Sequence, residues 1–494
     1  MKQNFWKWTC AAAAFTFFAC SSDSSSTAPA EELSSSSQSQ ESSSSFTENP
    51  SVESSNSSVE NPEKDDPSDN ENADTDTLST STWLTWDVPA PKSGTYTAPD
   101  SAVMVSLQDE NISVTNAGTK SVSVSGNQLL IGSGGLYVLS GNLSDGQILI
   151  NVIKTAKVEL VLNGVQIHNS KNAPIFFVEG DKVKLELVEG SVNVLSDSRH
   201  YEFMNVGTYT EADSVPKACL YSREDMTIGG NGTLYVTGNY NNGIHTKADL
   251  VIKDSPKIYV NAVNNALKGK GSVRIKEGGE YYLRTGDGSG ISSDKVGNLE
   301  KGRIAIGTGK FKMDVGNAGV KATNLDSIGN GTFEIRTKNG DAFHAETVQI
   351  FEGDYSIESG DEAFNASKNL MLVNGSAEIT KSSKPFIGSE NFTISEGRWF
   401  GLGGGFDSTM IPKSAEIFTA VLNLSEEVKK GAEVSIQNEE GTVILTATAE
   451  KNIQSIFAAT SEFSAGQYKV VIDSQTLCSF TFDASNKIAT QCVN

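Results

Sequence analysis

The sequence lacks the residue patterns of several common catalytic and ligand-binding sites. Its 494 residues include only four histidines and five cysteines, and these do not form a Ser/His/Asp triad or a Cys/His metal site. A glycine-rich phosphate loop is also absent. The sequence therefore gives no support to triad hydrolysis, to phosphate-loop nucleotide binding or to a zinc site.

Basic residues are also fewer than acidic residues. The chain has 39 Lys and Arg against 61 Asp and Glu, which gives a formal net charge of −22. Residues 21–82 hold fourteen acidic residues and one lysine, so they carry −13 and leave −9 for the rest of the chain. A folded part with this mild negative charge does not call for a cationic partner, and its sign argues against nucleic acid.

Large apolar residues are almost absent from residues 21–82. Apart from two valines, only Leu33, Phe46 and Leu78 occur there, among many Ser, Thr, Asn, Pro, Asp and Glu residues. A segment of this composition cannot bury enough apolar surface to offset its ordering entropy. We therefore predict that residues 21–82 form a disordered, acidic tether.

Residues 1–20 have a basic start, an apolar run and Ala19 before Cys20. This is typical of a secretory signal that is removed on export, and the run is too short to span a membrane. The end of the segment resembles a bacterial lipobox, although Phe18 stands where Leu is usual. The resemblance implies lipidation of Cys20, whereas an ordinary signal peptide is the alternative. A lipidated protein would be exported and anchored to the bacterial envelope, at the outer membrane or cell surface.

One phrase returns seven times between Tyr240 and Gly388, at intervals of 21 to 29 residues. Each copy has a small residue or proline, then a large apolar residue, then a strand with apolar residues at alternate positions. The large apolar residues are Ile244, Leu267, Ile291, Val320, Phe343, Phe364 and Phe386. Alternation predicts strands, and the fixed period predicts a solenoid. The fold predicted for residues 83–413 is all-β, a right-handed parallel β-helix of ~22-residue coils whose like positions stack about 4.8 Å apart.

Two interruptions and a final module complete this prediction. Residues 197–216 and 287–303 interrupt the repeat and are expected to be loops. Residues 414–494 alternate again and predict a small antiparallel β-module, which would cover the open edge of the last coil. Cys478 and Cys492 lie near each other in this module, and we predict a disulfide because an exported protein can keep them oxidised.

The polar corner just before each large apolar residue is the candidate site. Asn242 and Asn265 occupy this corner in adjacent coils, which predicts a ladder of stacked side-chain amides. Farther along, the corner carries Asp341 and then Asp361 and Glu362. Carboxylates stacked at strand spacing repel one another unless a cation neutralises them, and calcium prefers such oxygen ligands. The alternative is that these side chains point apart into solvent.

Several phrases occur in a characteristic order between residues 98 and 473. They include Gly134–Gly141 (GGLYVLSG), Val161–Val165 (VLNGV), Gly230–Gly238 (GNGTLYVTG) and Lys451–Ser455 (KNIQS). Their order resembles that of bacterial carbohydrate-binding domain-containing proteins, calcium-binding parallel β-helices that are similar in shape to pectate lyases. The resemblance implies binding of plant cell-wall polysaccharide, either cellulose or acidic sugars such as pectin fragments, without cleavage.

The chain departs from this family at the coil corner. The repeated Asp of the family is replaced by Asn at positions 242 and 265, and only Asp341 keeps its place. Asp361 and Glu362 form a shifted variant, and Asp287 lies in an inserted coil. The resemblance therefore implies calcium at these four acidic residues but not in the first coils.

Two other functions are compatible with the same residues. A glycoside hydrolase on this scaffold would need two carboxyl groups roughly 5–9.5 Å apart, and stacking could bring Asp341 and Asp361 to such a distance. A polysaccharide lyase would need a basic residue beside calcium, but Arg274, Arg284 and Arg303 are not aligned with the acids. A structural adhesin that binds no sugar is the third possibility.

Overall fold

A computed structural model describes residues 77–79, 81–109, 111–207, 209–210 and 215–493. The predicted signal segment, Cys20 and nearly all of the predicted tether lie outside these residues. The described chain is almost entirely β-structure and includes one short 3-10 helix, η2 (Ser408–Met410). Within the described residues, no helix has the length and apolar character needed to cross a membrane.

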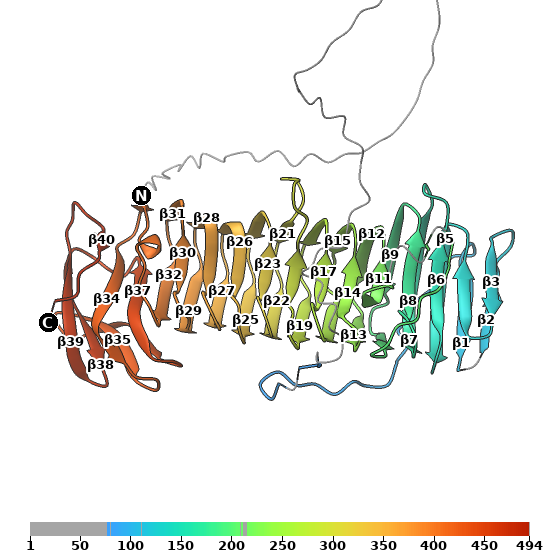
Figure 1. Cartoon of the computed structure of the whole chain (residues 1–494), viewed down its shortest axis with the longest axis horizontal. Helices are drawn as coiled ribbons and strands as arrows, with labels where there is room; N and C mark the ends of the chain where they lie inside the picture. Colours follow the sequence, from blue (N-terminus) through green and yellow to red (C-terminus); the bar gives the residue numbers. More distant parts are fainter. Residues whose placement is uncertain (1–76, 80, 110, 208, 211–214, 494) are drawn as a thin grey trace, which may run out of the picture. The chain divides into compact units, whose positions relative to one another are not determined.

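Parallel strand pairing from one coil to the next forms a β-solenoid, which confirms the predicted parallel β-helix. Figure 1 shows the strands of successive coils side by side. Each coil contributes a strand to each of three faces, so every face is a ladder of short parallel strands. Like positions of successive coils are therefore hydrogen-bonded neighbours.

The first face contains β1 (Val103–Gln108), β10 (Val192–Asp197), β13 (Thr233–Gly238), β16 (Lys257–Ala262), β19 (Glu280–Thr285), β22 (Lys310–Val315), β25 (Thr332–Thr337), β27 (Asp354–Glu358), β29 (Ser376–Lys381) and β32 (Arg398–Gly403). The second face contains β9 (Lys182–Leu187), β12 (Asp225–Gly230), β15 (Asp249–Ile252), β18 (Ser272–Ile275), β21 (Arg303–Ile306), β24 (Leu325–Ile328), β31 (Asn391–Ile394) and β33 (Ser414–Ala415). The third face contains β4 (Gln128–Ile131), β6 (Gln147–Asn151), β8 (Ile175–Glu179), β11 (Ala218–Ser222), β14 (Asn242–Thr246), β17 (Leu267–Gly269), β20 (Ile291–Ser293), β23 (Val320–Ala322) and β30 (Phe386–Gly388).

Four longer strands pass from one face to another. The strands β5 (Gly135–Leu143) and β7 (Lys157–Asn169) begin on the second face and end on the first. The strands β26 (Phe343–Ile350) and β28 (Phe364–Leu372) begin on the third face and end on the second. They give the faces continuous hydrogen bonding around a corner of the coil.

The seven large apolar residues of the repeat stack in the interior in the predicted order. Each is the register partner of the next, from the pair Ile244–Leu267 to the pair Phe364–Phe386. The ring of Phe364 stacks on Phe343 at 4.9 Å between centroids and on Phe386 at 5.2 Å, with nearly parallel planes. This column is therefore a continuous part of the apolar core.

Both ends of the solenoid carry antiparallel structure. At the N-terminal end, β1 pairs with β2 (Asn111–Thr115), and β3 (Val122–Ser125) pairs with β4. At the C-terminal end, β32 pairs antiparallel with β37 (Ile453–Thr460), which also pairs antiparallel with β34 (Thr419–Val428), whereas β34 pairs in parallel with β40 (Ile488–Ala489). These strands cover edges that would otherwise be open to intermolecular pairing.

A separate four-stranded antiparallel sheet completes the C-terminal module, as predicted. Its order is β36 (Val443–Thr448), β35 (Glu433–Asn438), β38 (Gly466–Ile472) and β39 (Gln475–Phe482). A second apolar core lies in the module and includes Phe400 and Leu402 of the last solenoid strand, β32. Cys478 on β39 is joined to Cys492 by a disulfide across a sequence separation of 14 residues, with 5.4 Å between the Cα atoms.

The segment before β1 lies along the first face, and we call residues 77–79 and 81–97 the strap. The ring of Trp83 lies 4.5 Å from Nζ of Lys312 and 4.4 Å from Cζ of Arg336. The ring of Trp86 lies 4.0 Å from Cζ of Arg284. Cation–π contacts with outward-pointing side chains of β19, β22 and β25 thus hold the strap against the solenoid.

Backbone contacts fix the two ends of the strap. The carbonyl oxygen of Thr77 stands only 1.9 Å from where a Cβ of residue 286 would be, so Gly286 is needed for this approach. The backbone N–H of Lys92 donates to the carbonyl of Val192 at 3.1 Å, and the reverse bond is 2.8 Å. Between these ends Leu84 is buried. The described strap therefore starts beside β19, in the middle of the solenoid.

Candidate functional site

The polar corner of the third face forms a column of side chains, one from each coil. Asn242 and Asn265 are adjacent members, and both are buried. The Oδ1 atom of Asn242 accepts the backbone N–H of Asn265 at 3.1 Å and its side-chain amide at 2.9 Å. The Oδ1 atom of Asn265 accepts the backbone N–H of Ser289 at 3.0 Å. The structure thus brings the two asparagines together in a hydrogen-bonded ladder.

Asp341 occupies the same column four coils after Asn242. Its Oδ1 accepts the backbone N–H of Glu362 at 2.9 Å, which repeats the bond that each asparagine makes. Its Oδ2 lies 2.7 Å from Nδ1 of His344 and accepts the side-chain amide of Asn365 at 3.1 Å. Asp341 therefore has a structural role equivalent to that of the asparagines, and it carries a negative charge in addition.

Asp341, Asp361 and Glu362 form an acidic cluster, the only such cluster of potential metal ligands among the described residues. One carboxylate oxygen from each of the three lies within 4.8 Å of the others. Asp341 and Glu362 are buried, whereas Asp361 is exposed. Lys384, the next member of the column, places its Nζ 3.1 Å from Oε1 of Glu362.

The negative charges of the acidic cluster are not fully neutralised by the cationic side chains around them. Burial raises the pKa of Asp361, and the neighbouring charge of Glu362 raises it further. Calcium binds oxygens at about 2.3–2.6 Å, so two ligands of one ion lie at most ~5 Å apart. The spacing of the cluster fits this limit. A cation here would compete with Lys384 for Glu362 and with the donors that already hold Asp341.

Asp287 is not part of this cluster. It is an exposed residue that lines a polar cavity of about 530 Å³ between the strap and the first face, together with Asp314 and Arg336. Its backbone N–H donates to the carbonyl of Val263 at 3.0 Å. The four acidic residues implied by the family resemblance therefore divide into one group of three and one separate residue.

The arrangement of the three carboxylates differs from a hydrolytic pair. Glycoside hydrolases hold two carboxyl groups roughly 5–9.5 Å apart on either side of the scissile bond. In this protein Asp341 and Glu362 belong to one hydrogen-bonded column, and each is engaged by a cationic or amide side chain. The cluster can bind a cation or a hydroxyl-bearing ligand more readily than it can supply a separate acid and base.

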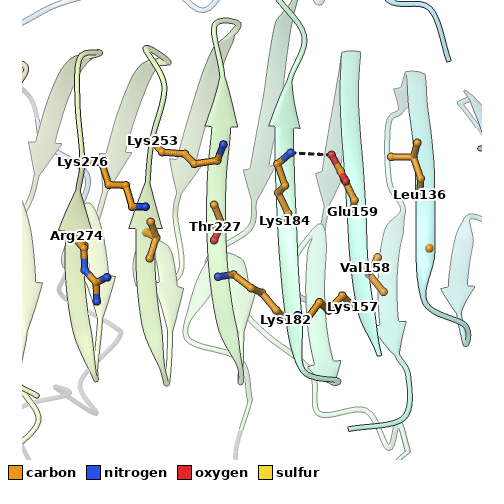
Figure 2. A pocket seen from close by; sticks show the side chains of 12 residues that line it. Leu136, Lys157, Val158, Glu159, Lys182, Lys184, Thr227, Lys253, Arg274 and Lys276 are labelled. Carbon is orange, nitrogen blue, oxygen red and sulfur yellow. Dashed lines mark hydrogen bonds and ion pairs between the residues drawn. The ribbon is translucent and has the colours of Figure 1, made fainter. Parts of the chain in front are cut away.

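A second polar feature, which the sequence reading missed, lies on the outside of the second face. A groove of about 610 Å³ crosses β5, β7, β9, β12, β15 and β18. Figure 2 shows its side chains on successive strands, with Thr227 between cationic residues. The cationic residues that line it are Lys157, Lys182, Lys184, Lys253, Arg274 and Lys276. Glu159 is the acidic residue of the lining, and we call this feature the basic groove.

Coil register explains why these side chains come together. Glu159 pairs with Lys184, and Lys184 pairs with Thr227. Thr227 pairs with Val251, and Val251 pairs with Arg274. All five are outward positions of one column. Outward lysines at alternate positions of the single strands were the available signal, but their alignment appears only when the coils are stacked.

The fold and these surfaces define a parallel β-solenoid that exposes ordered rows of polar and charged side chains on its outer faces. Comparison with known proteins gives the particular family. The model of the carbohydrate-binding domain-containing protein family matches residues 125–397, more than half of the chain, and the protein belongs to this family. The matched residues include both the acidic cluster and the basic groove.

Individual relatives match over shorter stretches. A carbohydrate-binding domain-containing protein of Acetivibrio thermocellus is 47% identical over 131 residues, which are 26% of this chain and 44% of that protein. The chain thus spans less than half the length of this relative. A solved structure described as the polysaccharide lyase-like protein from C. thermocellum, as a gadolinium derivative, is 36% identical, with a TM-score of 0.45. It covers 50% of this chain and 94% of its own.

Proposed function

We propose that the protein is a non-catalytic polysaccharide-binding lipoprotein of the bacterial envelope that recognises plant cell-wall carbohydrate. The family match across residues 125–397 is the observation that carries the proposal. The solenoid supports it physically, because a rigid surface that repeats at about 4.8 Å presents regularly spaced groups to a polymer. The engaged carboxylates of the acidic cluster also favour binding over hydrolysis.

The test measures binding and cleavage in the same samples. The protein is incubated with cellulose and with pectin, and the bound fraction is measured by pull-down. Reducing ends and unsaturated products are followed in the supernatant. We expect retention on at least one polymer without any product. Formation of unsaturated or reducing-end product would instead identify a lyase or a hydrolase, and no retention on any polymer would favour a structural adhesin.

Calcium is the second part of the proposal, with Asp341, Asp361 and Glu362 as its ligands. Bound calcium would neutralise the like charges that raise the pKa of Asp361. Because such binding favours only the native state, added calcium should raise the melting temperature of chelated protein in a concentration-dependent way. The pair Asp341→Asn and Asp361→Asn should abolish this response. The control variant Asp287→Asn should keep it, since Asp287 lies outside the cluster.

Equal melting temperatures with chelator and with calcium would remove the metal from this proposal and leave polysaccharide binding intact. A calcium response that survives in the double Asn variant would place the metal elsewhere. Whichever of these outcomes is found, the coils that contain Asn242 and Asn265 should not respond to calcium, because neutral amides already complete their ladder.

Membrane anchoring through Cys20 is the third part. The segment Phe17–Cys20, which lies outside the described residues, supports it by its resemblance to a lipobox. Replacing Cys20 by Ala should move the protein from the membrane fraction to the soluble fraction and leave its melting temperature unchanged. If the variant still sediments with membranes, another part of the chain is the anchor.

A further inference from the structure

We propose that the basic groove is the binding site for an anionic polysaccharide, one that carries carboxylate or sulfate groups along its chain. This inference rests on the proposed carbohydrate-binding function and adds to it the site and the charge of the ligand. The groove lies on the second face, separate from the acidic cluster at the corner of the third face. Nothing in the calcium proposal depends on it.

The charge of the groove is the first argument. Six cationic side chains line it, against the single carboxylate of Glu159. This contrasts with the formal net charge of −9 that the chain carries outside residues 21–82. A concentration of one sign inside a concave surface raises the local concentration of ligands of opposite sign. The groove is therefore suited to an anion.

The pairing of these cations is the second argument. Lys184 lies 2.9 Å from Glu159 and 3.1 Å from Glu186, so its charge is largely compensated within the protein. By contrast, Lys182, Arg274 and Lys276 form no ion pair with any other residue in the described ranges, and Arg274 and Lys276 are exposed. At least three positive charges are thus available to a ligand.

The floor of the groove provides a third, independent argument. Thr227 is 5% exposed, and its Oγ1 has no hydrogen-bond partner within the described part of the chain. A buried hydroxyl without a partner is unfavourable unless a ligand or water bonds to it. It lies between the cationic side chains, with Lys182 on one side and Lys253 on the other (Figure 2). A sugar hydroxyl on the groove floor would supply the missing bond.

The direction and lining of the groove select an anionic polymer over a neutral one. The floor runs through six successive strands, a length of roughly 24 Å at the spacing of a β-sheet. Its apolar contacts come from aliphatic side chains such as Leu136, Val158 and Val251, and no described residue of the lining is aromatic. Neutral glycans depend on stacking against apolar ring faces, whereas this groove offers charge and hydrogen bonds.

The test compares four polymers under one condition. Purified protein is titrated with polygalacturonate, dextran sulfate, fully methyl-esterified pectin and duplex DNA. Chelator is present throughout, so that calcium at the acidic cluster cannot contribute. We expect binding to polygalacturonate or dextran sulfate that weakens as salt is added, because counter-ions screen exposed charges. The relative affinities for these two polymers distinguish carboxylate from sulfate as the recognised group.

A charge-matched pair of variants locates the site. Lys182→Gln with Arg274→Gln removes two cations that have no ion-pair partner, so the fold should be unaffected, as a melting curve can verify. We expect this variant to bind the anionic glycan about tenfold more weakly. The control, Lys310→Gln with Lys469→Gln, removes the same charge from the first face and the C-terminal sheet and should bind like the parent.

The outcomes separate the inference from the proposed function. If both double variants bound the glycan equally weakly, or if neither bound it more weakly than the parent, the groove would not be the site. Glycan binding by the protein would still stand. Equal binding of methyl-esterified and free polygalacturonate would refute the anionic class. Tighter binding of DNA than of any glycan would refute a polysaccharide ligand for the groove. Failure to bind any of these glycans in chelator would refute the groove as the site, and failure in the pull-down with cellulose and pectin as well would refute the proposed function.

Discussion

Asp326 provides the sharpest test of the energetics of this solenoid. It occupies an inward position on β24, where its register partners are Ile304 and Val348. Its side chain is 0% exposed, and neither carboxylate oxygen has a hydrogen-bond partner of good geometry among the described residues. Burial raises the pKa of Asp326 well above its ordinary value, and the backbone N–H of His344 opposes this only in part.

The sign of the pH dependence follows from this raised pKa. The native state holds the proton of Asp326 more tightly than the unfolded chain, in which the pKa is near 3.8. The free energy of unfolding should therefore fall as pH rises from about 4 towards the pKa of the folded state. At pH values below both pKa values the group is neutral in both states and contributes no pH dependence.

A valine at position 326 would have the branched shape and apolar character of its register partners in the column. A neutral buried carboxyl without a partner costs about 1–3 kcal/mol, and each unit by which its pKa is raised adds ~1.4 kcal/mol once the pH exceeds that pKa. We expect Asp326→Val to stabilise the protein by at least this first amount at pH 4.5 and by more at pH 8. Asp326→Asn should remove the pH dependence while keeping much of the polar cost.

The assay is urea unfolding followed by circular dichroism between pH 4.5 and pH 8, with parent and variants measured side by side. The outward-facing neighbour on the same strand provides the control, since Ser327→Val changes no inward position. If Asp326→Val had the stability of the parent at every pH, the side chain would have to be solvated or paired. The reasoning about its burial would then be wrong.

Three further predictions concern other parts of the fold. Phe364→Asp should lower the melting temperature strongly, because it removes a ring stacked on both sides and buries an unpaired charge; unchanged melting would contradict its inward position. Breaking the disulfide with Cys478→Ser should destabilise the C-terminal sheet by about 3 kcal/mol, as for a closed loop of similar length, and reduction of parent protein should reproduce the loss if Cys492 has no other partner. Lys384→Met should enlarge the calcium-induced rise in melting temperature, since it removes the ammonium beside Glu362; a smaller rise would mean that Lys384 does not compete with the metal.

The repeat in the sequence predicted the solenoid and the register of its third face. This succeeded because residues such as Ile244 and Phe343 recur at a nearly fixed period and must stack to be buried. The strand β37 was not predicted. All its residues except Gln454 are buried, because it lies between β32 and β34 and contacts apolar groups on both sides. A strand buried on both faces has no alternating pattern to detect.

The acidic cluster and the basic groove differ in how far the sequence alone could predict them. Asp341 and Glu362 occupy a defined position of the repeat, so their proximity followed from the period. The groove draws one to three residues from in or beside each of six strands of the second face, and an outward lysine on a single strand looks like an ordinary solvated charge. Only the coil register places these side chains in one groove. That register is hardest to predict from the sequence in the part of the chain where the repeat begins.

The strap determines where a pulling force would enter the folded protein. Thr77 is packed beside Gly286, so tension on the preceding chain would act on the flank of the solenoid and not on the hairpins that cap its end. Beyond Thr77 the load would reach the hydrogen bond from the Ser81 hydroxyl to Asp314, and then the rings of Trp83 and Trp86 on their cationic partners. These contacts are individually weak and can reform. The strap can therefore detach under load before any coil unfolds, so that every coil keeps its ladder of backbone hydrogen bonds.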